Sequence, residues 1–490
     1  MSNSTYLSLV VCGKRLRSQW RAEAGRFFPE ARAELVEAKT LDRDLPALIE
    51  QAEKNSEPLV AIVSYETVTR KIDSLCGYAW DDLIVDEAVV LKNASSQRCQ
   101  ALWELRAHAE RGVALTGTPI ERDLDDLGAI VAWTRGDREM FHGVRLSKRF
   151  DATDPASVAA LWDALGPTVF RRDRSEIADE LPQVQTETIL LDPEPAERKL
   201  ADAARNHLRE ILDELTGKIN EAAELDPNDP AVAEAKEELA ALRGAALGGV
   251  TLARMAACDP AAVANSDSVG AALLDSKGLV EPAVATGGTK RQQIVGLTTE
   301  LVEAGESVLI FTDFSSLADN LVSDLEAAGV RVGCIKGGMT DKAAQDAQDG
   351  FQGAAGGQIG EDIKYDCLVL TKTAREGLNL QRASVLVHYD LPWKASDMVQ
   401  RVGRASRIGS TADTLQVLIP VMAGTIEERA AKKLVTRAVT ALAVLDDPRG
   451  VDTKNTEVAQ ALAGLQETIS EEEMEDGDKG IISLARDLIG

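Results

Sequence analysis

The chain has 490 residues, more than one ordinary hydrophobic core holds, so we expect two or more domains. Its formal net charge of −26 argues against a surface coated in nucleic acid, although it leaves room for a local basic groove. The six cysteines include no CxxC pair, which predicts reduced thiols and no structural metal site. No run of 18 apolar residues occurs, so we expect a soluble, cytoplasmic protein.

The first part of the chain alternates short apolar runs with helical stretches. The apolar runs predict strands at residues 6–12, 58–64, 82–85 and 112–115. Such alternation is typical of a parallel sheet in an α/β fold, whose ligands bind at the carboxyl ends of the strands. Polar residues follow the third and fourth runs, and we expect them at this edge: Asp86 and Glu87 come directly after the third, and Thr116 and Thr118 lie within three residues of the end of the fourth.

The strand pattern disappears at residues 194–285, where Ala, Glu and Leu dominate. The Asp-Pro-Asn-Asp-Pro sequence at 226–230 divides this segment and predicts a helical hairpin. Its acidic character indicates a solvated face, with an interaction surface as the alternative. Five further apolar runs predict a second α/β domain, at residues 307–312, 331–335, 365–370, 384–389 and 415–421.

These patterns predict four segments along the chain. They are a first lobe at 1–193, a helical insertion at 194–285, a second lobe at 286–445 and an acidic tail at 446–490.

Asp86 and Glu87 form an acidic pair directly after an apolar strand. The first carboxylate can hold a phosphate-bound Mg²⁺ through water, and the second can orient or deprotonate a hydrolytic water. Adjacent acidic residues are common and often only solvated. Here Lys92 and Asn93 follow, and then Thr116, so the ordered set is more specific than the pair alone.

Residues 400–409 carry Gln400, Arg404 and Arg407 at helical spacing, which predicts that the three side chains share one helix face. Guanidinium groups held on one face suit a phosphate chain because each is a permanently charged planar fork. The alternative is a solvated basic face.

Taken together, these segments resemble the Swi/Snf-like branch of the superfamily-two helicases and translocases, most closely its bacterial RapA-like remodellers. The resemblance covers roughly residues 5–435, and Val89 stands where the family carries a histidine after its acidic pair. The segments that carry it are 10–20 (motif Ia), 86–89 (the DEAH-type box), 115–119 (motif III), 170–173 with 181–182 (the segment that leaves the first lobe), 308–314 (motif IV), 371–380 (motif V) and 400–409 (motif VI).

The resemblance implies an α/β protein of two RecA-like lobes that clamp ATP and Mg²⁺ between them, and that move along double-stranded DNA. Its implied catalytic residues are Asp86 (holding Mg²⁺ through water), Glu87, Arg404 and Arg407. Nucleotide contacts fall on Thr116, Thr118, Gly377, Asn379 and Gln400. Contacts with DNA phosphates fall on Lys92, Asn93, Lys372 and Thr373, although Lys372 is also compatible with a plain surface lysine.

One departure from the family is serious: the chain contains no Gly-x-x-x-x-Gly-Lys-Ser/Thr phosphate loop. We therefore expect a segment from outside this chain to supply the loop, as a gene split over two reading frames or a start codon assigned too far downstream would require. The predicted function is an ATP-dependent DNA helicase or translocase in phage or bacterial replication or repair, which places it in the bacterial cytoplasm. The alternatives are a non-catalytic nucleic-acid-binding scaffold and the motor of a restriction or modification enzyme.

Overall fold

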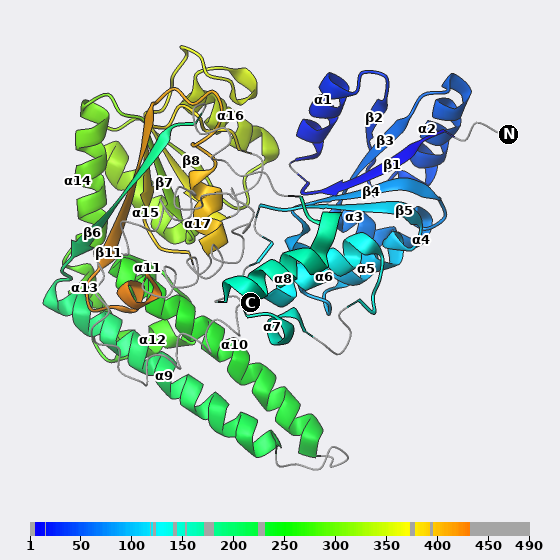
Figure 1. Cartoon of the computed structure of the whole chain (residues 1–490). Helices are drawn as coiled ribbons and strands as arrows, with labels where there is room; N and C mark the ends of the chain where they lie inside the picture. Colours follow the sequence, from blue (N-terminus) through cyan, green and yellow to red (C-terminus); the bar gives the residue numbers. More distant parts are fainter. Residues whose placement is uncertain are drawn as a thin grey trace. The chain divides into compact units, whose positions relative to one another are not determined.

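The computed structural model describes residues 5–14, 16–117, 119–120, 124–140, 145–151, 154–170, 181–223, 231–372, 378–392 and 395–431. The chain divides into two compact units, one containing the described residues up to 170 and the other those from 181 to 431. Each unit is built around a parallel sheet (Figure 1).

The first unit has a five-stranded sheet with the order β2-β3-β1-β4-β5, in which every neighbouring pair is parallel. The four predicted strands are present, and a short strand that the sequence pattern missed lies at one edge. Its sequence, Arg-Ala-Glu-Leu, is too short and too polar to give an apolar run. The strands are β1 (Leu7–Cys12), β2 (Arg32–Leu35), β3 (Leu59–Ser64), β4 (Trp80–Asp86) and β5 (Ala109–Leu115).

The two faces of this sheet are covered unequally in the part of the chain that the structure describes. One face carries a large core in which strand residues pack against α2 to α6. The other carries a small cluster of Val10, Cys12 and Ile62, against which Leu16 and Trp20 pack at the start of α1. The helices of this unit are α1 (Arg17–Phe27), α2 (Leu41–Asn55), α3 (Tyr65–Arg70), α4 (Ile72–Leu75), η1 (Ala88–Lys92), α5 (Gln97–Arg106), α6 (Leu124–Arg135), α7 (Leu146–Arg149), α8 (Pro155–Leu165) and η2 (Gly166–Thr168).

The second unit has a six-stranded parallel sheet with the order β6-β11-β10-β7-β9-β8. The predicted boundary at residue 193 assigned β6 to the first lobe, but β6 pairs along its whole length with β11. A local pattern shows only that a segment is extended; which sheet it joins depends on a partner more than 200 residues away. The strands are β6 (Gln183–Leu191), β7 (Val308–Thr312), β8 (Val332–Ile335), β9 (Cys367–Thr371), β10 (Val385–His388) and β11 (Thr414–Met422).

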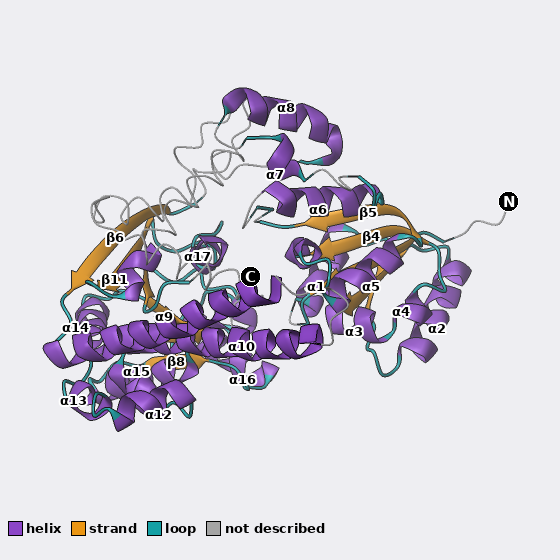
Figure 2. Cartoon of the chain, turned by 90° about the horizontal axis from the view of Figure 1, so that it is seen from below, coloured by secondary structure: helices purple, strands orange, loops and turns teal. Residues whose placement is uncertain are grey.

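Helices cover both faces of the second sheet, α14 and α15 on one side and α16 and α17 on the other. The long helices α9 and α10 lie side by side and share an apolar core with α12 and α13 (Figures 1 and 2). None of the described helices is both long enough and apolar enough to cross a membrane. The helices of this unit are α9 (Pro195–Ala223), α10 (Ala231–Cys258), α11 (Pro260–Ala264), α12 (Val269–Ser276), α13 (Val280–Val284), α14 (Thr289–Glu303), α15 (Ser315–Ala327), α16 (Asp341–Gln352), η4 (Ala355–Gly357) and α17 (Ala395–Val402).

Candidate functional site

The acidic pair stands where β4 ends, and its backbone is held in an unusual conformation. Glu87 has a φ of 53°, in the left-handed region, which among the described non-glycine residues only Ser56 shares. The Tyr65 hydroxyl donates to the carbonyl oxygens of Asp86 at 2.5 Å and of Glu87 at 3.3 Å. A left-handed glutamate costs about 1–3 kcal/mol, and such strain persists where surrounding contacts hold it in place, often at functional sites.

Both oxygens of the Asp86 carboxylate accept hydrogen bonds. Oδ1 accepts from the backbone N–H of Glu87 at 3.0 Å, and Oδ2 accepts from the indole Nε1–H of Trp20 at 2.8 Å. The described residues contain no cluster of three or more His, Cys, Asp or Glu side chains that could coordinate a metal ion. A single carboxylate fits Mg²⁺ in the way that phosphate-bound Mg²⁺ is usually held, with water and phosphate oxygens as its other ligands.

Thr116 lies at the same edge of the sheet as this pair. Asp86 on β4 is in register with Leu115 on β5, so Thr116 directly follows the neighbouring strand. The first unit therefore brings Asp86, Glu87 and Thr116 together. Thr118 lies outside the described residues.

Lys92 and Asn93 follow the acidic pair at the end of η1. The Asn93 side chain accepts from the backbone N–H and the hydroxyl of Ser95, at 3.2 and 2.8 Å. This turn leads to Ser96, whose hydroxyl caps α5 by accepting from the N–H of Cys99. Asn93 therefore shapes the start of α5, while its exposed position leaves it accessible to a ligand; Lys92 is half-buried.

In the second unit, the predicted helix over residues 400–409 is wrong beyond Val402, where α17 ends. Residues 403–409 form turns, so Gln400, Arg404 and Arg407 do not share one helix face. Polar contacts stabilise these turns: the Ser410 hydroxyl donates to the carbonyl of Ala405 and accepts from the N–H of Arg407.

The turn that contains Arg404 contacts the segment that contains Asn379. The Arg404 carbonyl accepts from the N–H of Leu380 at 3.1 Å, which places Arg404 beside the segment that contains Asn379. Oδ1 of Asn379 is a buried acceptor that no group in the described residues satisfies. Nε of Arg407 donates to the Gly403 carbonyl at 2.8 Å, and burial lowers the pKa of this guanidinium.

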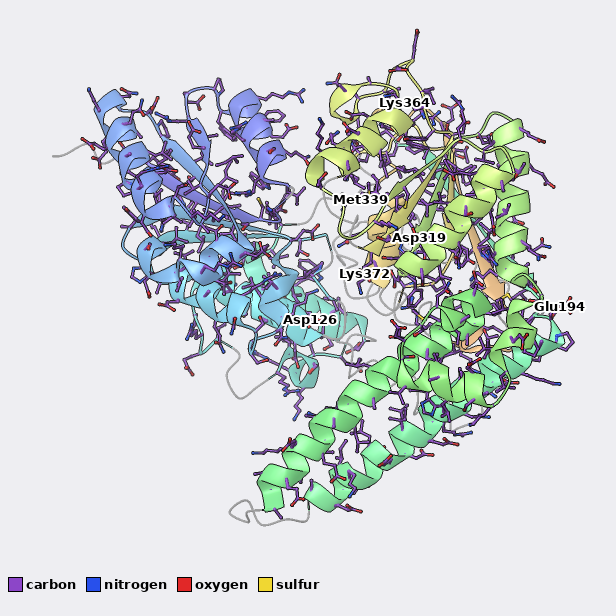
Figure 3. The ribbon with its side chains drawn as sticks, turned by 180° about the vertical axis from the view of Figure 1, so that it is seen from behind. Asp126, Glu194, Asp319, Met339, Lys364 and Lys372 are labelled. Carbon is purple, nitrogen blue, oxygen red and sulfur yellow. The ribbon has the colours of Figure 1, made fainter. Side chains whose placement is uncertain are left out.

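Lys372 is exposed at the end of β9 (Figure 3). Gln400 is half-buried in the last turn of α17. Thr373 and Gly377 lie outside the described residues.

The structure adds a buried charge cluster, made of Arg254, Asp313, Asp390 and Arg401. Arg401 of α17 donates to Asp313 at 2.8 Å and to the Asp390 carbonyl at 2.9 Å. Arg254 of α10 reaches both carboxylates, at 3.0 Å for Asp313 and 3.2 Å for Asp390. Both aspartates follow apolar strands, the same signal that singled out Asp86, so the sequence could have indicated them.

His388 borders this cluster. Its Nδ1 lies 3.2 Å from the Arg401 guanidinium, and burial together with that positive charge holds the pKa of His388 well below its usual range. A neutral imidazole accepts from Arg401 at this nitrogen. The contact fixes α17 against the end of β10.

Residues 3–228 match the SNF2-related domain, and residues 289–409 match the helicase conserved C-terminal domain. Together the two matches cover more than half of the chain. The chain belongs to the Swi/Snf-like superfamily-two helicases. These matches confirm the family expected from the sequence. The two parallel sheets confirm the expected α/β class with two lobes.

The relatives of this Swi/Snf-like chain are distant and mostly longer. It is 22% identical to an uncharacterized ATP-dependent helicase of Mycoplasma pneumoniae, over 86% of this chain and 35% of that protein. It is 24% identical to the protein CHROMATIN REMODELING 19 of Arabidopsis thaliana (95% of this chain, 66% of that one) and to the ISWI chromatin-remodeling complex ATPase ISW1 of Saccharomyces cerevisiae (86% and 34%). A solved SWI2/SNF2 ATPase core of Sulfolobus solfataricus in complex with dsDNA is 21% identical over 90% of this chain and 82% of that one, with a TM-score of 0.35.

Proposed function

We propose that this chain is the motor part of an ATP-dependent DNA translocase of the Swi/Snf type. The observation that carries the proposal is the strained Asp86–Glu87 turn at the carboxyl end of β4, within a chain whose two halves match the two domains of this helicase family. Asp86 holds the Mg²⁺ of the nucleotide through water, and Glu87 orients the attacking water.

The second unit supplies the positive charge in this proposal. Arg404 and Arg407 stabilise the charge that develops on the γ-phosphate in the transition state. Asn379, Gln400 and Gly377 bind the nucleotide, and Thr116 and Thr118 couple its state to lobe movement. Lys92, Asn93, Lys372 and Thr373 contact duplex DNA through its phosphates with little reading of bases.

No phosphate-loop sequence occurs within these 490 residues. In this proposal the backbone N–H groups that bind the β- and γ-phosphates therefore belong to a segment outside them. A strand of that segment can pair with an edge strand of the first sheet. Both sides of β4 are occupied, by β1 and β5, so a further parallel strand fits only at an edge. Strands lie about 4.8 Å apart, so the position beyond β5 is about 10 Å from β4 and the position beyond β2 is about 19 Å away.

The edge at β5 has the features of an incomplete sheet. In the described residues β5 pairs with β4 alone, and its Val113 and Leu115 side chains are 37% and 39% exposed. Parallel sheets normally bury both faces, and unpaired apolar edges favour pairing with another segment. A phosphate loop following a strand at this position would reach the nucleotide beside Asp86.

A phosphate-release assay tests the proposal. The chain is assayed with duplex DNA, alone and together with a segment that carries a strand, a Gly-x-x-x-x-Gly-Lys-Ser/Thr loop and a helix, supplied from the upstream reading frame in cis or co-expressed. We expect negligible turnover alone, DNA-stimulated turnover with the segment, and loss of that turnover in Glu87→Gln. Robust turnover by the isolated chain that Glu87→Gln removes would show that another loop holds the phosphates.

The absence of the phosphate-loop sequence also favours a second candidate, a non-catalytic nucleic-acid-binding scaffold with the helicase fold. Nucleotide binding separates the two. A scaffold would bind DNA but would show no Mg²⁺-dependent ATP binding even with the segment present.

A further inference from the structure

Helix α1 has two sides of different character. On its inner side the Trp20 ring packs against the apolar cluster of Val10, Cys12 and Ile62. From there its indole N–H donates to Oδ2 of Asp86 at 2.8 Å. A residue in the first helix therefore contacts the carboxylate assigned to Mg²⁺, 66 positions further along the chain.

On its outer side and at its approach, α1 presents exposed positive charge. Lys14, Arg21 and Arg26 are exposed, whereas the only acidic residue of the helix is Glu23. Arg26 lies over the ring of Phe27, which is itself 63% exposed. In a chain with a net charge of −26, such a basic and aromatic surface suits a polyanion such as the phosphate backbone of DNA.

We propose that Trp20 is a positioning residue that transmits the placement of α1 to the Asp86 carboxylate. Phosphates bound on the outer side of α1 fix the helix, and the indole then holds Oδ2 in the orientation that Mg²⁺ requires. Oδ1 is fixed by the backbone N–H of Glu87, so the Trp20 contact is what removes the remaining freedom of the carboxylate. This inference rests on the proposed function, because it assigns Asp86 to Mg²⁺ and DNA to the same unit.

The contact is tested first by NMR of the whole chain with ¹⁵N-labelled tryptophan. Trp20→Phe identifies the indole resonance, and Asp86→Asn should shift it, since an amide replaces the carboxylate acceptor. An unshifted resonance in Asp86→Asn would overturn the contact.

The coupling is tested by adding a short DNA duplex without nucleotide. We expect the Trp20 indole resonance to move on DNA binding, and the shift to be lost in Arg21→Glu/Arg26→Glu. If fluorescence anisotropy shows DNA binding while the resonance stays in place, the coupling is wrong and the proposed function stands. If no DNA binds at all, both fail.

Activity of the chain with its phosphate-loop segment gives the third readout. In Trp20→Phe, which keeps an aromatic ring and removes the N–H, we expect the Mg²⁺ concentration for half-maximal turnover to rise about tenfold, the equivalent of one charge-assisted hydrogen bond. DNA affinity should stay unchanged. Trp103→Phe is the matched control, because Trp103 is also a half-buried tryptophan of this unit but packs on the opposite face of the sheet. Equal Mg²⁺ dependence in the two variants would refute the positioning role.

Discussion

Replacing Arg254 by Met should destabilise the second unit by about 3–5 kcal/mol, since it leaves a buried charge uncompensated. Arg254 and Arg401 together balance Asp313 and Asp390, and the exposed fractions of these side chains are only 14%, 2%, 7% and 1%. Without Arg254, two buried carboxylates share one guanidinium. The Leu391 carbonyl also loses the donor that now lies 2.9 Å away.

Hydrogen exchange of the whole chain in increasing urea measures this effect. Peptides from β10 and α17 should lose protection at lower urea in Arg254→Met, while peptides from the first unit should not change. Arg243→Met is the control, because Arg243 is an exposed arginine on the same helix and should cost less than about 0.5 kcal/mol.

A double-mutant cycle with Asp390→Asn decides whether the cluster acts as a unit. Removing a carboxylate and an arginine together should cost less than the sum of the single changes. Additive losses, or a loss below about 1 kcal/mol in Arg254→Met alone, would refute the view that these charges depend on one another.

Three further predictions follow from single residues. His388 is held neutral in the folded protein but gains a proton below about pH 6.5 in the unfolded chain. The free energy of unfolding, measured in urea titrations, should therefore fall by about 1.4 kcal/mol between pH 7.5 and 5.5. This fall should be smaller in His388→Gln. Glu87→Gly should raise thermal stability by about 1 kcal/mol by relieving the left-handed backbone, yet abolish the DNA-stimulated phosphate release of the chain with its phosphate-loop segment; a destabilised variant would contradict the strain argument. The affinity for duplex DNA should fall linearly with salt on logarithmic axes, and Lys372→Ala should reduce the slope by about 1; salt-independent affinity would favour the scaffold.

The elements that depend on near neighbours along the chain were predictable from the amino-acid sequence. Apolar runs of four to seven residues are long enough to show a buried parallel strand, so β1, β3, β4 and β5 were predictable, and so was the position of Asp86 and Glu87 at a strand end. The Ala-rich pattern likewise predicted helices at α9 and α10.

The features that depend on distant partners became visible only in the folded chain. β6 joins the second sheet because β11 accepts its whole length, and no local pattern carries that information. Helix α17 stops at Val402 because contacts among Gly403, Arg407 and Ser410 compete with helical hydrogen bonds. The contacts of Trp20 with Asp86 and of Arg254 with Asp390 join groups 66 and 136 residues apart, and the free energy of such contacts exists only once the chain has folded around them.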